Sequence, residues 1–159
     1  MKVLVECDAD EAVLRALGLS RKQLLHIGCK YELVKELKKR AHDVGMVDED
    51  PGKVQPQDMG SYRQTDSAEG LHLMARQGSG GQRLIMICPK LEDWLIARAK
   101  ASGIRPEDYG LPSDPDKLHS IPRYEQKEGF CRFLAELKEQ DSGMHLLRRW
   151  ILEAESRLK

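Results

Sequence analysis

The chain has 159 residues, of which 40% are hydrophobic and 33% charged, and its 26 basic side chains equal its 26 acidic ones in number. This composition predicts one folded domain and excludes a disordered or fibrous protein. A net charge of zero excludes a general attraction to nucleic acid, so binding to DNA or RNA would need a local basic patch or bridging metal ions.

The N-terminal residues show no targeting or membrane signal. The segment from Met1 to Val5 runs directly into Glu6 and Asp8, which does not resemble a secretory leader. The longest apolar runs, such as residues 84–88, are far shorter than the roughly 20 residues that cross a bilayer. We therefore expect a cytoplasmic protein that makes no membrane contact.

Cysteine and histidine spacing gives no sign of a metal site. The four cysteines have no C-x-x-C spacing, and the five histidines form no H-x-x-x-H pair. In a reducing compartment such cysteines are most simply small buried residues. The sequence therefore predicts that the four cysteines are buried, namely Cys7, Cys29, Cys88 and Cys131. It predicts structural or exposed roles for the five histidines, His26, His42, His72, His119 and His145.

The first elements in the chain are a strand and a helix. Residues 2–6 form a β-branched run that predicts a strand with Glu6 at its end. A helix-start signal follows at 8–10, and the apolar stripe Val13, Leu14 and Leu17 predicts a helix that ends at Gly18.

The same order then repeats. Residues 24–28 predict a second strand, and apolar residues at helical spacing within 31–37 predict a second helix. Residues 42–47 predict a third strand, which runs into the acidic segment 48–50, where proline and glycine force a loop. The pattern predicts an α/β fold with a mostly parallel, Rossmann-like sheet. Acidic residues therefore end two strands at the edge where such sheets bind ligands.

The middle of the chain predicts a loop and a hairpin. Residues 52–70 are polar and weakly patterned, which indicates a long functional loop over that edge. Residues 71–76 and 82–88 flank a glycine-rich tip at 78–81, which predicts an antiparallel hairpin on the parallel sheet.

The last third predicts helices. A helix is predicted at 91–103, and a proline-rich loop follows it at 104–122. Two amphipathic helices are then predicted, at 123–139 and at 143–158. We predict an α/β domain at 1–103, with a C-terminal loop and helical extension at 104–159 packed on the same core.

The acidic residues at the strand ends predict a metal site. Mg²⁺ binds hard oxygen ligands and keeps several waters, so two or three carboxylates suffice to hold it. Asp48 and Asp50, two residues apart on an extended strand end, are expected to point to the same side, with Glu6 as a third carboxylate and Glu49 on the other side. The alternatives are an acidic, solvated loop at 48–50 and a helix-capping role for Glu6.

Two segments, Val3-Leu4-Val5-Glu6 followed by Asp10 and residues 44–50 with the D-x-D of Asp48 and Asp50, resemble the TOPRIM family. This is the metal-dependent domain shared by topoisomerases, bacterial primases, small ribonuclease-type maturases and OLD-family nucleases. The resemblance covers roughly residues 2–103. It implies a small nuclease or phosphotransfer enzyme acting on nucleic acid, with Glu6 as general acid/base and Asp48 and Asp50 as ligands of Mg²⁺ or Mn²⁺.

Other charged residues extend this hypothesis. Glu92 and Asp93 look like an acidic helix-start motif of small TOPRIM-like proteins and would bring carboxylates toward a second metal, although acidic residues are also ordinary in a first helical turn. Lys30 begins the second helix, where it is a candidate phosphate contact. The basic run of this helix is either a solvated face or a phosphate track: Lys35, Lys38, Lys39 and Arg40.

Two further hypotheses stay open. Glu6, Asp8 and Asp48 also resemble the acidic pocket of a receiver-like module that accepts a phosphoryl group. Alternatively, the chain is a non-catalytic subunit with the same fold, whose C-terminal helices bind a partner protein through an apolar stripe: Leu146, Leu147, Trp150 and Ile151.

Overall fold

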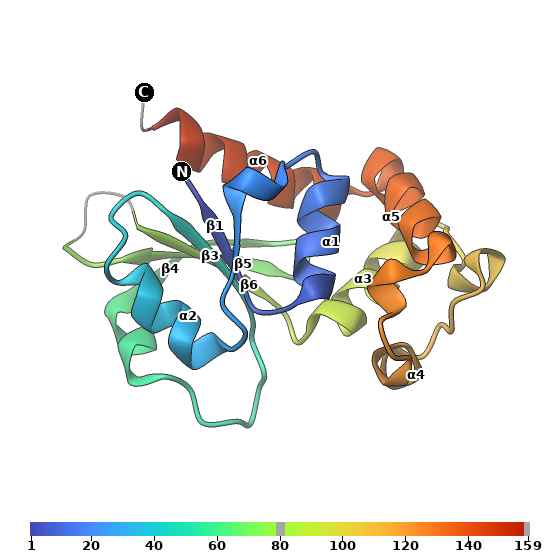
Figure 1. Cartoon of the computed structure of the whole chain (residues 1–159), viewed down its shortest axis with the longest axis horizontal. Coiled ribbons are helices and arrows are strands. Elements are labelled where there is room, and N and C mark those ends of the chain that lie inside the picture. Colours follow the sequence, from blue (N-terminus) through green and yellow to red (C-terminus); the bar gives the residue numbers. More distant parts are fainter. Residues whose placement is uncertain (79–81, 158–159) are drawn as a thin grey trace.

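The computed structural model describes residues 1–78 and 82–157 and has the predicted α/β class. Within these residues, six strands form one mixed sheet in the order β2-β1-β3-β6-β5-β4, flanked by helices (Figure 1). The strands are β1 Val3–Val5, β2 Leu24–His26, β3 Val44–Asp48, β4 Tyr62–Ala68, β5 Leu71–Arg76 and β6 Arg83–Ile87.

The parallel half of the sheet contains a topological switch point. Strands β2, β1, β3 and β6 are parallel, whereas β5 and β4 continue the sheet in antiparallel pairs. The chain passes from β1 outward to β2 and then returns across β1 to β3. The connection that leaves β1 runs toward one edge of the sheet, and the connection that leaves β3 runs toward the other. In open α/β sheets, ligands bind beyond the carboxyl ends of such a strand pair.

Helices cover both faces of the sheet. Successive side chains of a strand point to opposite faces, so each strand contributes residues to the core on either side. Val3 and Val5 join a large core with α1, α3, α5 and α6, whereas Leu4 joins a smaller core with α2. Figure 1 shows α4 and α5 together at one end of the molecule, beside α3. The helices are α1 Asp8–Ala16, α2 Lys30–Leu37, α3 Leu91–Ala101, α4 Pro115–Ser120, α5 Glu128–Gln140 and α6 Ser142–Ser156.

The predicted strands and most predicted helices are confirmed, with ends that differ by a few residues. The antiparallel hairpin is also confirmed, since β5 pairs with β6 from Leu71↔Ile87 to Ala75↔Arg83. Of its predicted tip at 78–81, only Gly78 belongs to the described residues, and Leu158 at the end of the last predicted helix also lies outside them.

The prediction of a loop at 52–70 was wrong for its second half. A 3-10 helix at Gln57–Ser61 leads into β4, the strand at the edge of the sheet. After Tyr62, every residue of β4 is exposed. An edge strand solvated on both faces has no alternation of apolar and polar residues, so its sequence looks like a loop.

The predicted loop at 104–122 likewise contains structure, a 3-10 helix at Pro106–Tyr109 and the short helix α4. Proline opens each of them at its first turn, a position where the missing N–H costs nothing. Helix α5 begins at Glu128, five residues later than predicted, after a 3-10 helix at Tyr124–Gln126.

The C-terminal extension shares the core of the α/β domain. Leu118, Phe130 and Trp150 belong to the same buried cluster as Val3 and Ile85 of the sheet. The apolar stripe of α6, considered above as a partner surface, is therefore core: Leu146, Leu147, Trp150 and Ile151 are all at most 7% exposed. A partner bound through the C-terminal helices stays a prediction, and it would have to use their outer faces.

Candidate functional site

The carboxyl ends of β1 and β3 bring Glu6 and Asp48 together at the switch point. The two strands are hydrogen-bonded neighbours, with Val3 opposite Val44 and Leu4 opposite Gly45. The backbone N–H of Asp48 donates to Oε1 of Glu6 at 3.1 Å. Two carboxyl groups far apart in the sequence therefore share one end of the sheet, as the sequence predicted.

Asp48 carries the least satisfied polar group of this site. In the described part of the chain, its Oδ1 is buried and has no hydrogen-bond partner. Burial, followed by the charges of Asp10, Glu6 and Asp50, raises the pKa of Asp48 to about 8. A buried carboxylate oxygen without a donor is costly, and a bound cation is one way to satisfy it.

Glu6 has a similar environment. Burial is the largest cause that raises its pKa to about 7, while the hydrogen bond from Asp48 and the charge of Lys30 act in the opposite direction. A carboxyl group with a pKa near neutrality can exchange a proton at physiological pH, which is the property required of a general acid or base.

Asp10 belongs to the same cluster but has a structural task. Its Oδ2 accepts hydrogen bonds from the backbone N–H groups of Glu6 and Cys7, at 3.2 and 3.1 Å. It thereby fixes the turn that joins β1 to α1, and burial raises its pKa to about 6. Asp8, in contrast, is exposed and pairs with His26 at 3.2 Å.

Asp50 does not point where its spacing from Asp48 suggested. Strand β3 ends at Asp48, and Asp50 adopts a left-handed backbone with φ of 49°, so the alternation of an extended strand no longer applies. Its carboxylate pairs with Nζ of Lys30 at 3.1 Å and with Nζ of Lys53 at 4.0 Å. It still lies close enough to raise the pKa of Asp48.

Lys30, the candidate phosphate contact, is nearly buried at 9% exposure and points into this edge. Besides Asp50, its Nζ donates to the backbone oxygen of Glu49 and to Oε1 of Gln55, both at 3.1 Å. It is the first residue of α2. The ammonium group thus holds the loop after β3 in place.

Glu92 also faces the cluster, whereas nothing in the structure gives Asp93 a comparable position. The Glu92 carboxylate is buried, accepts hydrogen bonds from Tyr124 and His119 at 2.8 and 2.9 Å, and contributes to the raised pKa of Asp48. Sequence patterns did not indicate Tyr124 or His119 as partners of Glu92, because both lie in the extension, more than 25 residues away.

A surface hollow of about 440 Å³ opens beside the cluster. Glu6, Lys30 and Asp50 line it, together with Tyr31 and Val54. These last two side chains are 60% and 100% exposed, although both are large and apolar. The hollow therefore offers charged groups and an aromatic face side by side.

The basic residues that follow the end of α2 are largely neutralised by the chain itself. Lys39 and Arg40 pair with Glu36, and Lys38 pairs with Asp58, at distances of 3.0–3.3 Å. This arrangement favours a solvated helix face over a phosphate track.

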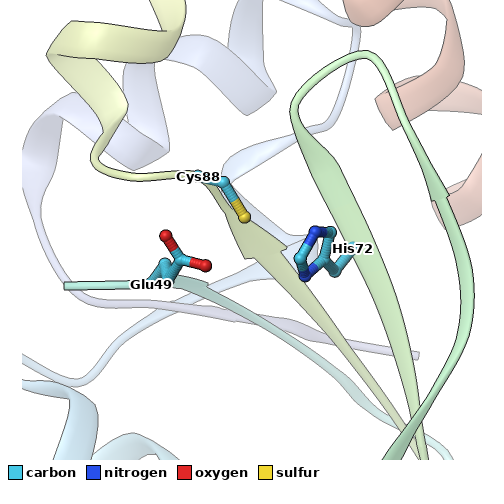
Figure 2. A group of neighbouring side chains, drawn as sticks. All are labelled: Glu49, His72 and Cys88. Atoms are coloured by element: carbon cyan, nitrogen blue, oxygen red, sulfur yellow. The ribbon is translucent and has the colours of Figure 1, made fainter. Parts of the chain in front are cut away.

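The trio Glu6, Asp48 and Asp50 fits a metal only in part. Within the described residues, two groups place three ligand atoms within 4.8 Å of one another, and this trio is not one of them because Asp50 turns toward Lys30. The two groups are Asp8 with Glu11 and His26, and Glu49 with His72 and Cys88 (Figure 2). Glu6 and Asp48, with an unsatisfied oxygen on the latter, retain the donor set that suits Mg²⁺.

No family model, curated protein or solved structure matches this chain. Among the residues that the structure describes, no helix is both long and apolar enough to span a bilayer.

Proposed function

We propose that the protein is a divalent-metal-dependent enzyme that cleaves or transfers phosphodiesters of nucleic acid. The observation that carries this proposal is the buried, unpartnered Oδ1 of Asp48, which lies next to Glu6 at the switch point of the sheet. A cluster of carboxyl groups with raised pKa values in such a place is typical of a functional site. Mg²⁺ or Mn²⁺ is the cofactor that its oxygen donors would hold.

Asp48 and Glu6 supply the carboxylates closest to this cation. When bound, the cation would neutralise negative charge that develops on the phosphate oxygens. Glu6 is the general acid/base, because its pKa of about 7 lets it give or accept a proton near neutral pH. The resemblance of residues 2–103 to the TOPRIM family implies the same division of roles.

Asp50 and Lys30 act as a pair in this proposal. Their ion pair of 3.1 Å would have to open for Asp50 to help Asp48 and Glu6 hold the metal. The same opening frees the Lys30 ammonium for a substrate phosphate. Tyr31, exposed beside them in the hollow, provides a face on which a nucleic acid base can stack.

The test compares cleavage of single-stranded and double-stranded DNA and RNA by the wild-type protein and two isosteric variants, Glu6→Gln and Asp48→Asn, with Mg²⁺ or Mn²⁺. We expect Glu6→Gln to lower the rate by roughly 10²–10⁴-fold, the usual contribution of a general acid or base. Asp116→Asn, which alters an exposed carboxylate of α4, should leave the rate unchanged.

Retained cleavage in both site variants, with folding verified by circular dichroism, would overturn the proposal. A stable phosphoryl adduct on Asp48 after incubation with a small phosphodonor would instead support the receiver-like alternative. Absence of both cleavage and divalent metal binding would favour the non-catalytic subunit.

A further inference from the structure

A second cluster of possible metal ligands lies on the other side of the β3 end. Glu49 follows β3, His72 is the second residue of β5, and Cys88 follows β6. One ligand atom of each lies within 4.8 Å of those of the other two. Figure 2 shows the Glu49 carboxylate, the Cys88 thiol and the His72 ring gathered at this point.

The sheet holds the backbones of all three residues. The N–H of Glu49 donates to Ile87 at 2.8 Å, and that of Cys88 donates to Gly70 at 3.0 Å. His72 lies opposite Met86 in the β5–β6 ladder. The side chains therefore start from fixed positions, which is the condition under which a metal site is pre-organised.

The rest of the protein holds these side chains only weakly, and the Cys88 thiol donates a long hydrogen bond of 3.9 Å to the backbone oxygen of Met86. In residues 1–78 and 82–157, neither ring nitrogen of His72 has a hydrogen-bond partner, and no cationic side chain pairs with the Glu49 carboxylate. All three residues are partly buried, so an ion from solvent can reach them.

Their chemistry selects a different cation from the one proposed at Asp48. Thiolate and imidazole ligands suit Zn²⁺, whereas Mg²⁺ prefers oxygen alone. Tetrahedral coordination at the usual zinc bond lengths places neighbouring ligand atoms about 3.3–3.6 Å apart. The ligand atoms of the cluster, which lie within 4.8 Å of one another, reach these separations by moving closer together when the ion binds.

We propose that Glu49, His72 and Cys88 form a Zn²⁺ site with three protein ligands and one position open to water or another ligand. On binding, the thiol proton of Cys88 passes to solvent, so that thiolate and carboxylate together balance the charge of the ion while the imidazole stays neutral. Because Glu49 lies between Asp48 and Asp50, the ion ties the acidic loop to the β5–β6 hairpin. The site does not depend on the proposed enzymatic function.

The test uses Co²⁺ as a spectroscopic substitute for Zn²⁺ on the full chain without an affinity tag. We expect a thiolate-to-cobalt charge-transfer band that saturates at one Co²⁺ per chain, together with the visible bands of tetrahedral coordination, both removed by added Zn²⁺. Cys88→Ser should abolish the charge-transfer band. His72→Gln should weaken binding by roughly 10-fold or more, since even changes to outer-shell partners of a metal cost 10–100-fold.

Matched controls are Cys131→Ser and His42→Gln, which alter an exposed cysteine and an exposed histidine away from the cluster. Both should bind Co²⁺ like the wild-type protein, and so should Asp48→Asn, which separates this site from the proposed Mg²⁺ site.

Alkylation of the wild-type protein gives a readout that does not depend on the folding of variants. Zn²⁺, but not Mg²⁺, should slow the modification of Cys88 by iodoacetamide and leave that of Cys131 unchanged, as followed by peptide mass spectrometry. A wild-type protein without the charge-transfer band, a band that survives in Cys88→Ser, or alkylation of Cys88 that ignores Zn²⁺ would each overturn the proposal.

Discussion

Asp48 couples the acidic cluster to the stability of the fold. Its pKa in the folded protein is about 8, against an ordinary value of 3.8, mainly because the carboxyl group is buried. The unfolded chain therefore loses this proton at lower pH than the folded one. The resulting stabilisation is complete below about pH 4 and is lost as the pH rises toward 8.

Without divalent metal, we expect the free energy of unfolding to fall as the pH rises from about 4 to about 8. Asp48→Asn should remove about 1–3 kcal/mol of this decline. Each pKa unit corresponds to about 1.4 kcal/mol, and coupled carboxyl groups share the shift. Urea unfolding at several pH values measures both slopes. Asp116→Asn is the control that should keep the wild-type slope. An identical slope in Asp48→Asn would show that its carboxyl group is not destabilised by burial.

Gly45, in the middle of β3, gives a prediction about packing. A Cβ added there would lie 2.7 Å from Cδ1 of Leu84 and 2.9 Å from Cδ2 of Leu37, on the face covered by α2. We expect Gly45→Ala to destabilise the protein by about 1–3 kcal/mol, the usual cost of overpacking a core. Gly60→Ala, with open space around the added carbon, is the matched control in thermal unfolding.

At this scale the sequence predicted where Glu6 and Asp48 lie, because the end of a buried parallel strand has a defined place in the sheet. It failed for Asp50, whose left-handed backbone is a property of the loop, and for Tyr124 and His119, which reach Glu92 only through tertiary packing. Nor did the sequence predict that Glu49, His72 and Cys88 meet, because side chains from separate strands and strand ends have no characteristic spacing.

Among contacts between secondary-structure elements, Asp141 connects helices α3 and α6. It is fully buried, accepts a hydrogen bond from the Met144 N–H at the start of α6, and receives Nε of Arg98 from α3 and Oγ of Ser102, all at 2.9 Å. The cap and the ion pair therefore use the same carboxylate.

We expect Asp141→Ala to cost about 2–4 kcal/mol, because it removes a helix cap and one of the two carboxylates that pair with Arg98, while the other, Glu69 at 2.7 Å, remains. Asp114→Ala, which removes an exposed cap of α4, should cost only about 1 kcal/mol. Chemical denaturation compares the two. Equal costs would show that the Arg98 contact adds nothing to the cap.

Elements with strong apolar periodicity were predicted from the sequence, and those without it were not. Helices α3, α5 and α6 bury one face each, and their stripes are visible in the chain. Strand β4 has one buried residue, Tyr62, and depends on pairing with β5 for its conformation. The periodicity of apolar residues in a sequence reflects which side chains are buried. Strand pairing at an exposed edge produces no such periodicity.

For the whole molecule, the order of the strands in the sheet, rather than the composition, determines where the proposed site lies. A neutral chain has no general affinity for phosphate backbones, yet the return of the chain across β1 places Glu6 and Asp48 at one switch point, beside a hollow with an exposed tyrosine. The C-terminal helices complete the large core on one face of the sheet and supply Tyr124 to the acidic cluster.

The measurement that tests the central claim most directly is an anomalous difference map from a crystal grown with Mn²⁺. The account predicts a peak bonded to the carboxylates of both Glu6 and Asp48, with Oδ1 of Asp48 among the ligands. A map with no peak between these two side chains, or with Mn²⁺ only at other carboxylates such as Asp8 and Glu11, would contradict it.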